Sequence, residues 1–201
     1  HMFNVFIIII NFFIFYFIFI CLVNLFWKKK YKYIKNNESL SILIPARNEE
    51  KNISKCLSSI IKSGTSFNEI LIYNDHSTDK TEEEILKFTK NDKRIKIAQT
   101  KKLEKGWIGK SFACYQLGLQ SNFNWIVFLD ADTEVTGKLE NLISLAKKNK
   151  LSMLSAWPKI KMDSFSEFFF MPLLNFVVFT LCPMVFAKDL KSENLGIAHG
   201  A

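Results

Sequence analysis

Two aspartates separated by a single residue are the sharpest chemical feature of this sequence. Asp130 and Asp132 directly follow residues 125–129, an apolar segment typical of a buried strand. Residues i and i+2 of an extended strand point to the same side, so we expect the two carboxylates to lie close together. Such a pair repels unless a cation or a proton intervenes, and its oxygen ligands suit Mg²⁺ or Mn²⁺. The pair indicates a metal site; the alternative is a solvated pair that begins the next helix.

Two further polar clusters follow apolar segments. Residues 45–49 (Pro-Ala-Arg-Asn-Glu) follow residues 41–44, and residues 74–79 (Asn-Asp-His-Ser-Thr-Asp) follow residues 69–73. A turn explains either cluster alone, because Asn, Asp and Ser are common in turns and helix caps. In an open α/β sheet, however, ligands bind beyond the carboxyl ends of the strands. The clusters together favour one ligand site at that edge.

Short apolar runs alternate with amphipathic stretches from residue 39 onward. The pattern predicts strands at residues 41–44, 69–73, 94–98, 125–129 and 151–156. It predicts helices at residues 53–61, 79–90, 111–120 and 138–148. Strands that alternate with helices at this spacing indicate βαβ units, so we expect an α/β fold with a mainly parallel sheet flanked by helices.

Residues 3–27 are almost continuously Phe, Ile, Val and Leu, which is long enough to span a bilayer. A cleaved signal peptide would need a basic region before the apolar run and a small-residue cleavage site, and neither is present. The lysines at 28–35 predict that the chain after this anchor is cytoplasmic, at the cell membrane. The net charge of +8 suits anionic lipid, nucleic acid or phosphorylated ligands. Since the densest basic run follows the apolar segment, we expect a membrane and no nucleic acid as partner.

The three strand-end clusters resemble, in order and spacing, the motifs of the family 2 inverting glycosyltransferases, which have the GT-A fold. The resemblance covers residues 39–160. It implies a nucleotide-diphosphate sugar as donor, Mg²⁺ or Mn²⁺ as cofactor, and a GT-A-like sheet behind an N-terminal transmembrane helix. The implied nucleotide-sugar-binding residues are Pro45, Ala46, Glu49, Asp75, Lys110 and Asp130. The implied metal ligands are Asp130 and Asp132, of which Asp132 is the more direct.

Two residues depart from the family pattern. Asn74 stands where the family often has Asp, and His76 stands where Gly is common. Asp75, the carboxylate implied to hold the nucleoside, is retained. We interpret His76 as a tolerated turn residue without a catalytic role.

Residues 106–110 (Gly-Trp-Ile-Gly-Lys) resemble a segment of the branch that glycosylates carotenoid acids or is associated with hopanoids. Glycines let a backbone approach a ligand closely, and a helix N-terminus just beyond them favours an anion. Lys110 would meet the diphosphate as a point charge. The alternative is a glycine turn in which Trp107 packs as an apolar plug.

The predicted domains are an anchor at 3–27, a basic juxtamembrane segment at 28–40, a nucleotide-sugar-binding part at 41–136, and the start of an acceptor part at 137–201. Within the last, the apolar residues 165–187 favour an interfacial helical region; a second span is the alternative. Inverting transfer needs a base, and no carboxylate here aligns with the one in the family. We therefore expect a C-terminally truncated chain, inactive alone, whose base lies beyond residue 201.

Together these features predict a hexosyltransferase that transfers a sugar, glucose from UDP-glucose, to a lipid or isoprenoid acceptor with inversion. Two alternatives stay open: a polysaccharide synthase of the same fold, which would need further spans, and a non-enzymatic membrane module that binds nucleotide. A nucleotidyltransferase is disfavoured because no Gly-rich fingerprint with an activating Arg or Lys lies near the N-terminus.

Overall fold

The computed structural model describes residues 2–25, 38–156, 159, 162, 164–170, 173 and 177. It divides into two compact units, His1–Tyr31 with Ser155–Gly200, and Lys32–Leu154 with Ala201. The basic juxtamembrane lysines, most of the apolar segment 165–187 and the whole of 188–201 lie outside the described residues.

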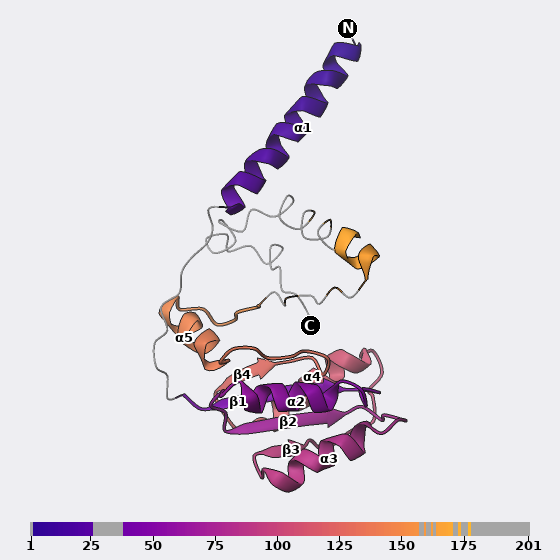
Figure 1. Cartoon of the computed structure of the whole chain (residues 1–201), viewed down its shortest axis with the longest axis vertical. Coiled ribbons are helices and arrows are strands. Elements are labelled where there is room, and N and C mark those ends of the chain that lie inside the picture. Colours follow the sequence, from indigo (N-terminus) through magenta and orange to yellow (C-terminus); the bar gives the residue numbers. More distant parts are fainter. Residues whose placement is uncertain are drawn as a thin grey trace. The chain divides into compact units, whose positions relative to one another are not determined.

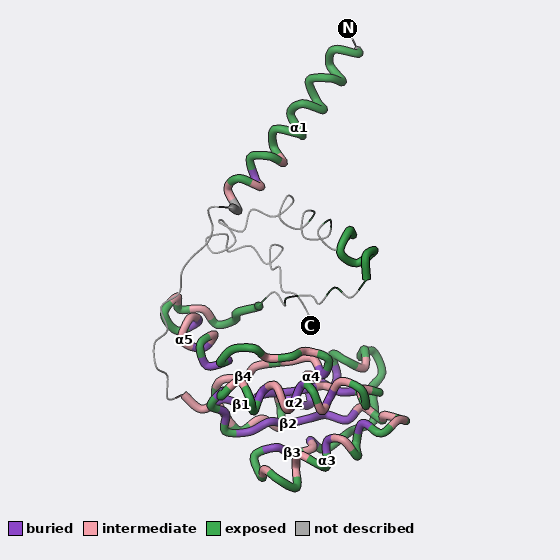
Figure 2. Tube along the Cα trace, viewed as in Figure 1, coloured by how far each residue is buried: buried purple, intermediate pink, exposed green. Residues whose placement is uncertain are grey.

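The first unit contains helix α1, Met2–Leu25, whose residues are almost all apolar and are largely exposed (Figure 2). Within it, Phe3–Val23 has a mean hydropathy of 3.0, and it is the one helix among the described residues long and apolar enough to cross a membrane. A helix rises about 1.5 Å per residue, so these residues extend about 32 Å, close to the thickness of a bilayer core. The predicted apolar helix is present at the expected place.

The second unit is built around four parallel strands, which in space follow the order β3-β2-β1-β4 (Figure 1). The strands are β1 Leu40–Ala46, β2 Glu69–Asn74, β3 Ile95–Ile97 and β4 Trp125–Phe128. The helices are α2 Ile53–Lys62, α3 Thr81–Asn91, α4 Gly109–Gln120 and α5 Glu140–Lys148. Each follows the strand–helix alternation that the sequence predicts.

Alternate residues of the central strand point to opposite faces of the sheet, and each face has its own core. Ile42 and Ile44 pack with Leu57 of α2, in a core that also includes residues of α3 and α5. Leu43, between them, packs with Leu117 of α4 on the other face. The crossovers to β2 and β3 thus use one face and the crossover to β4 the other. The order reverses between β1 and β4, which is where ligands bind in sheets of this kind.

A buried carboxylate ties the strands together at the amino end of β2. Glu69 accepts hydrogen bonds from the Ser41 hydroxyl of β1 at 2.7 Å and from the Asn122 amide N–H, before β4, at 2.7 Å. Burial alone raises the pKa of this carboxyl, but the hydrogen bonds from Asn122 and Ser41 and the charge of Lys96 outweigh it, so the pKa lies below its ordinary value. The network fixes β1, β2 and β4 at one end, which helps to align their carboxyl ends at the other.

The predicted strand at residues 151–156 is wrong. Lys150 has a left-handed φ of +54°, and the Leu151 amide closes α5 by donating to Ala146 O at 2.9 Å. Residues 152–156 are exposed and form no strand. Apolar composition alone does not make a strand, because the backbone also needs a neighbouring strand for its hydrogen bonds. Helix α4 also begins earlier than predicted, at Gly109.

Candidate active site

The loops that follow β1 and β2 are hydrogen-bonded to each other, which gives the carboxyl edge of the sheet a defined shape. The Asn48 side-chain oxygen accepts from the Thr78 amide at 2.8 Å, and the Glu49 amide donates to the Thr81 hydroxyl at 2.7 Å. Thr81 is fully buried at the start of α3. These hydrogen bonds join two loops about 30 residues apart in the sequence, so the loops are held in a defined position relative to each other.

Asp75, the first residue beyond β2, lies where three elements meet. Its amide donates to Ala46 O at the end of β1, at 2.8 Å. Its carboxylate is 3.5 Å from Arg47 Nη1. A Cβ atom placed on Gly109, the first residue of α4, would lie 3.2 Å from Asp75 Oδ2. Glycine at 109 therefore lets the first turn of α4 approach this carboxylate closely.

His76 explains why glycine is common at its position in the family that the sequence resembles. Its φ is +52°, in the left-handed region that favours glycine. Its ring Nδ1 lies 3.4 Å from Asp75 Oδ1, at an exposed position. The turn is thus kept without glycine, as expected for a tolerated turn residue.

Lys110 and Asp130 form an ion pair between α4 and the end of β4. The Lys110 Nζ atom lies 2.8 Å from Asp130 Oδ1 and 3.0 Å from Oδ2. Lys110 is one residue from Gly109, which approaches Asp75. The ends of β1, β2 and β4 therefore converge on the first turn of α4, and two of the predicted binding side chains are in direct contact.

The segment that carries Asp130 and Asp132 is a turn held against α2. The Thr133 amide donates to Asp130 O at 3.1 Å, and the Cys56 thiol of α2 donates to the same carbonyl at 3.6 Å. Ala131 is buried in the core. Farther along, the Val135 amide donates to the Ser59 hydroxyl of α2 at 2.8 Å. Helix α2 is thus hydrogen-bonded to the segment 130–135 at its first and last residues, Asp130 and Val135.

The two aspartates do not leave the sheet as an extended strand. Strand β4 ends at Phe128, so the alternation of side chains stops before Asp130. Asp130 points to Lys110 of α4. Asp132 is exposed, and its charge acts on Cys56 of α2: burial, followed by the charges of Asp132 and Asp130, raises the pKa of the Cys56 thiol to about 12. A turn, and not strand geometry, places the pair.

A metal that shares its coordination with a substrate needs few ligands from the protein. Among residues 2–25, 38–156 and the other described positions, no group of three or more His, Cys, Asp or Glu side chains is arranged to hold a metal ion. Mg²⁺ at phosphate-binding sites needs only one or two carboxylates, because phosphate oxygens and water complete its shell. Asp130 and Asp132 would supply two carboxylates from one turn.

The remaining predicted residues lie on the β1 side of the same edge. Ala46 is buried in the core, and its backbone oxygen accepts a hydrogen bond from the Asp75 amide at 2.8 Å. Pro45 is half-buried beside it, and the Glu49 carboxylate accepts a hydrogen bond from the Asn52 side chain at 2.8 Å. In the sequence, Arg47 is only one member of the 45–49 cluster, although a cation beside a strand end is a signal for anion binding. No sequence signal pointed to Cys56 or Ser59.

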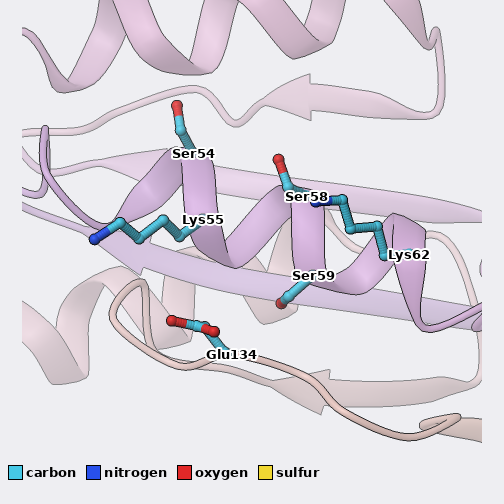
Figure 3. A pocket seen from close by; sticks show the side chains of 6 residues that line it. All are labelled: Ser54, Lys55, Ser58, Ser59, Lys62 and Glu134. Carbon is cyan, nitrogen blue, oxygen red and sulfur yellow. The ribbon is translucent and has the colours of Figure 1, made fainter.

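A hollow of about 410 Å³ lies along the flank of α2. Figure 3 shows the side chains that line it, which are Ser54, Lys55, Ser58, Ser59, Lys62 and Glu134. None of the predicted site residues is among them. We therefore place the candidate site at the strand ends, where Asp75, Lys110 and Asp130 meet the first turn of α4, and not in this hollow.

A parallel α/β sheet with this order, and with carboxylates and a lysine beyond its strand ends, has the GT-A-like architecture. The chain belongs to the glycosyl transferase family 2, whose model matches residues 41–198. The predicted fold class and family are confirmed.

Among its relatives is the 4,4'-diaponeurosporenoate glycosyltransferase of Staphylococcus aureus, 37% identical over 111 residues. The match covers 54% of this chain and 28% of the relative. The mannosyltransferase PcManGT of Pyrobaculum calidifontis, solved with GDP-Man and Mn²⁺, is 16% identical with a TM-score of 0.51, over 64% of this chain and 39% of that one. TarS of S. aureus is 21% identical with a TM-score of 0.47, over 63% of this chain and 39% of that one.

Proposed function

We propose that the protein transfers a sugar, glucose from UDP-glucose, to a lipid or isoprenoid acceptor with inversion at the anomeric carbon. The observation that carries this proposal is the convergence of Asp75 and the Lys110–Asp130 pair on the first turn of α4, in a family 2 sheet. The S. aureus relative, named for 4,4'-diaponeurosporenoate, supports an isoprenoid acceptor.

Each group at the strand ends has a proposed task. Asp75 hydrogen-bonds the nucleoside, against a surface formed by Pro45, the Ala46 backbone and Glu49. On donor binding, the Lys110 ammonium group moves partly away from Asp130 and contacts the diphosphate, which its flexible side chain allows. Asp130 and Asp132 would hold Mg²⁺ or Mn²⁺, which when bound would neutralise charge on the leaving diphosphate. We place the base that deprotonates the acceptor beyond residue 201.

Donor binding and transfer are tested separately. Calorimetry with this chain in detergent should show binding of UDP-glucose with Mn²⁺, and weaker binding of GDP-mannose, the donor seen with PcManGT. Transfer is measured with a form extended past residue 201, as radiolabel moving from UDP-glucose into the organic phase with an isoprenoid carboxylic acid. Radiolabel in a water-insoluble polymer would instead favour a polysaccharide synthase. Absence of nucleotide-sugar binding at millimolar concentration would reject the proposal.

We propose that α1 is a single anchor in the cell membrane and that the catalytic unit lies in the cytoplasm, where nucleotide sugars are made. In sealed, right-side-out vesicles, protease added outside should leave residues 39–150 intact, and detergent should expose them. Cleavage of this region in intact vesicles would overturn both the topology and the cytoplasmic donor supply.

The apolar segment that begins at Phe165 is proposed to be interfacial, beside the acceptor. Its start is helical, at residues 165–170, and Phe165 and Phe168 are exposed there. Ser164 and Glu167 cap this start reciprocally: the Ser164 amide donates to the Glu167 carboxylate at 3.1 Å, and the Glu167 amide donates to the Ser164 hydroxyl at 3.2 Å. The helical start supports a helix in this segment, which both the interfacial region and the alternative second span require.

The contact between α2 and the aspartate turn should affect metal-dependent binding. Cys56→Ala removes the thiol that donates to Asp130 O and should weaken Mn²⁺-dependent UDP binding about two- to fivefold, the scale of one modest hydrogen bond. Cys56→Ser keeps a donor and should restore most of the affinity. Calorimetry with Mn²⁺ and with EDTA separates the effects, because a role in packing alone would change the melting temperature without changing the ratio of the two affinities.

A further inference from the structure

The connection from β3 to α4 exposes apolar and basic side chains together. Residues 99–108 are exposed throughout, and among them Ile108 is 76% and Leu103 48% exposed. Three lysines, Lys101, Lys102 and Lys105, accompany a single acid, Glu104. We call the set Lys101, Lys102, Leu103, Lys105, Trp107, Ile108 and Tyr115 the α4 loop patch.

The aromatic side chains of the α4 loop patch are positioned by ring contacts with α4. The Trp107 ring stacks on Tyr115 of α4, with centroids 4.9 Å apart, and meets buried Phe112 edge-on at 5.8 Å. Trp107 nevertheless remains 38% exposed, and Tyr115 47%. Trp107 is therefore neither fully buried, as the alternative of an apolar plug expects, nor fully solvated. The Lys101 backbone is held as well, because its amide donates to the Tyr73 hydroxyl at 3.0 Å.

We propose that the α4 loop patch docks on the surface of an anionic lipid bilayer. Trp and Tyr combine an apolar ring with a polar group and concentrate at the headgroup level of membranes. Lysines beside them are attracted to anionic headgroups, and their apolar stems can lie along the interface. The excess of two positive charges over residues 101–105 matches such a surface, and the chain carries a helix with the length and hydropathy of a membrane span.

Docking here would bring the rim of the candidate site to the membrane. The patch runs directly into Gly109, where an added Cβ would lie 3.2 Å from Asp75 Oδ2, and into Lys110, which pairs with Asp130. A lipid acceptor could then reach the strand ends without crossing water. This route rests on the proposed transferase function, whereas membrane contact by the patch does not.

The experiment uses the whole chain reconstituted in vesicles that contain brominated lipid, with either phosphatidylcholine alone or added phosphatidylglycerol. The Trp107 signal is the difference between the parent chain and Trp107→Phe. We expect strong quenching of this signal in vesicles that contain phosphatidylglycerol. The triple change Lys101→Gln, Lys102→Gln and Lys105→Gln should lower the ratio of docked to undocked protein at least about tenfold, since each lysine near an anionic surface contributes about fivefold.

A matched control removes three exposed lysines from the helices on the other face of the sheet: Lys55→Gln, Lys62→Gln and Lys90→Gln. It changes the net charge equally and should leave the quenching unchanged. Equal loss in both triple variants, or a Trp107 signal shielded from acrylamide but not quenched by brominated lipid, would overturn the proposal. UDP binding by the reconstituted protein should not change in either triple variant. A failure of membrane docking is therefore distinguishable from a failure of the proposed donor site.

Discussion

Replacing Asp132 by alanine is expected to abolish the effect of Mn²⁺ on UDP binding. The parent chain should bind UDP more tightly with Mn²⁺ or Mg²⁺ than with EDTA, and in Asp132→Ala the two affinities should become equal. The expected loss of metal affinity is at least about 10- to 100-fold, since the loss of even an outer-shell partner costs that much. Isothermal calorimetry with metal and with EDTA measures both affinities directly.

Because Asp132 is exposed, its replacement should change metal binding without changing the stability of the fold. The neighbouring Ala131 is buried and holds the turn in the core, and the Ser59–Val135 hydrogen bond remains. Removing the Asp132 side chain therefore leaves the packing intact, and the melting temperature without ligand should change little. Glu83→Ala, which removes an exposed acid from α3, controls for net charge and should keep the full metal effect. Equal UDP affinity with and without metal in the parent chain would refute the metal site.

Replacing Asp75 by alanine is expected to weaken UDP binding by about 1.5–3 kcal/mol, the range of a hydrogen bond to a charged group. The carboxylate lies between Arg47, whose Nη1 is 3.5 Å away, and Gly109 at the start of α4, so it is already at the strand ends before the nucleotide binds. Titration calorimetry at constant Mn²⁺ measures the change. Asp75→Asn, which keeps the shape and an acceptor oxygen, should lose less.

The neighbouring His76→Gly variant is the control for the Asp75 turn. Its left-handed φ of +52° suits glycine, so the turn should be retained and UDP affinity should change little. A larger loss of affinity in His76→Gly than in Asp75→Ala would mean that the strand end has been misassigned. The comparison therefore tests which of two adjacent residues contacts the nucleoside.

The sequence alone was sufficient for the class of fold, and it predicted the candidate site residues at the ends of strands. Apolar runs such as residues 41–44 and 69–73 alternate with amphipathic helices, and this local pattern follows directly from which side chains must be buried. The polar clusters that contain Asp75 and Asp130 mark strand ends, because a buried strand must leave the core where its apolar run stops. The apolar helix α1 was equally predictable from the sequence, since its length and hydropathy define it.

Only the tertiary structure decided which of these pieces become neighbours. Strand β4 pairs with β1, about 85 residues away, and this brings Asp130 to Lys110. The contacts of α2 with the aspartate turn, through Cys56 and Ser59, cross 74 and 76 residues. Residues 151–156 have a strand-like composition but form no strand. Local patterns record which groups avoid water, whereas hydrogen-bond partners are set by the path of the chain through space, and a short stretch of sequence does not contain that path.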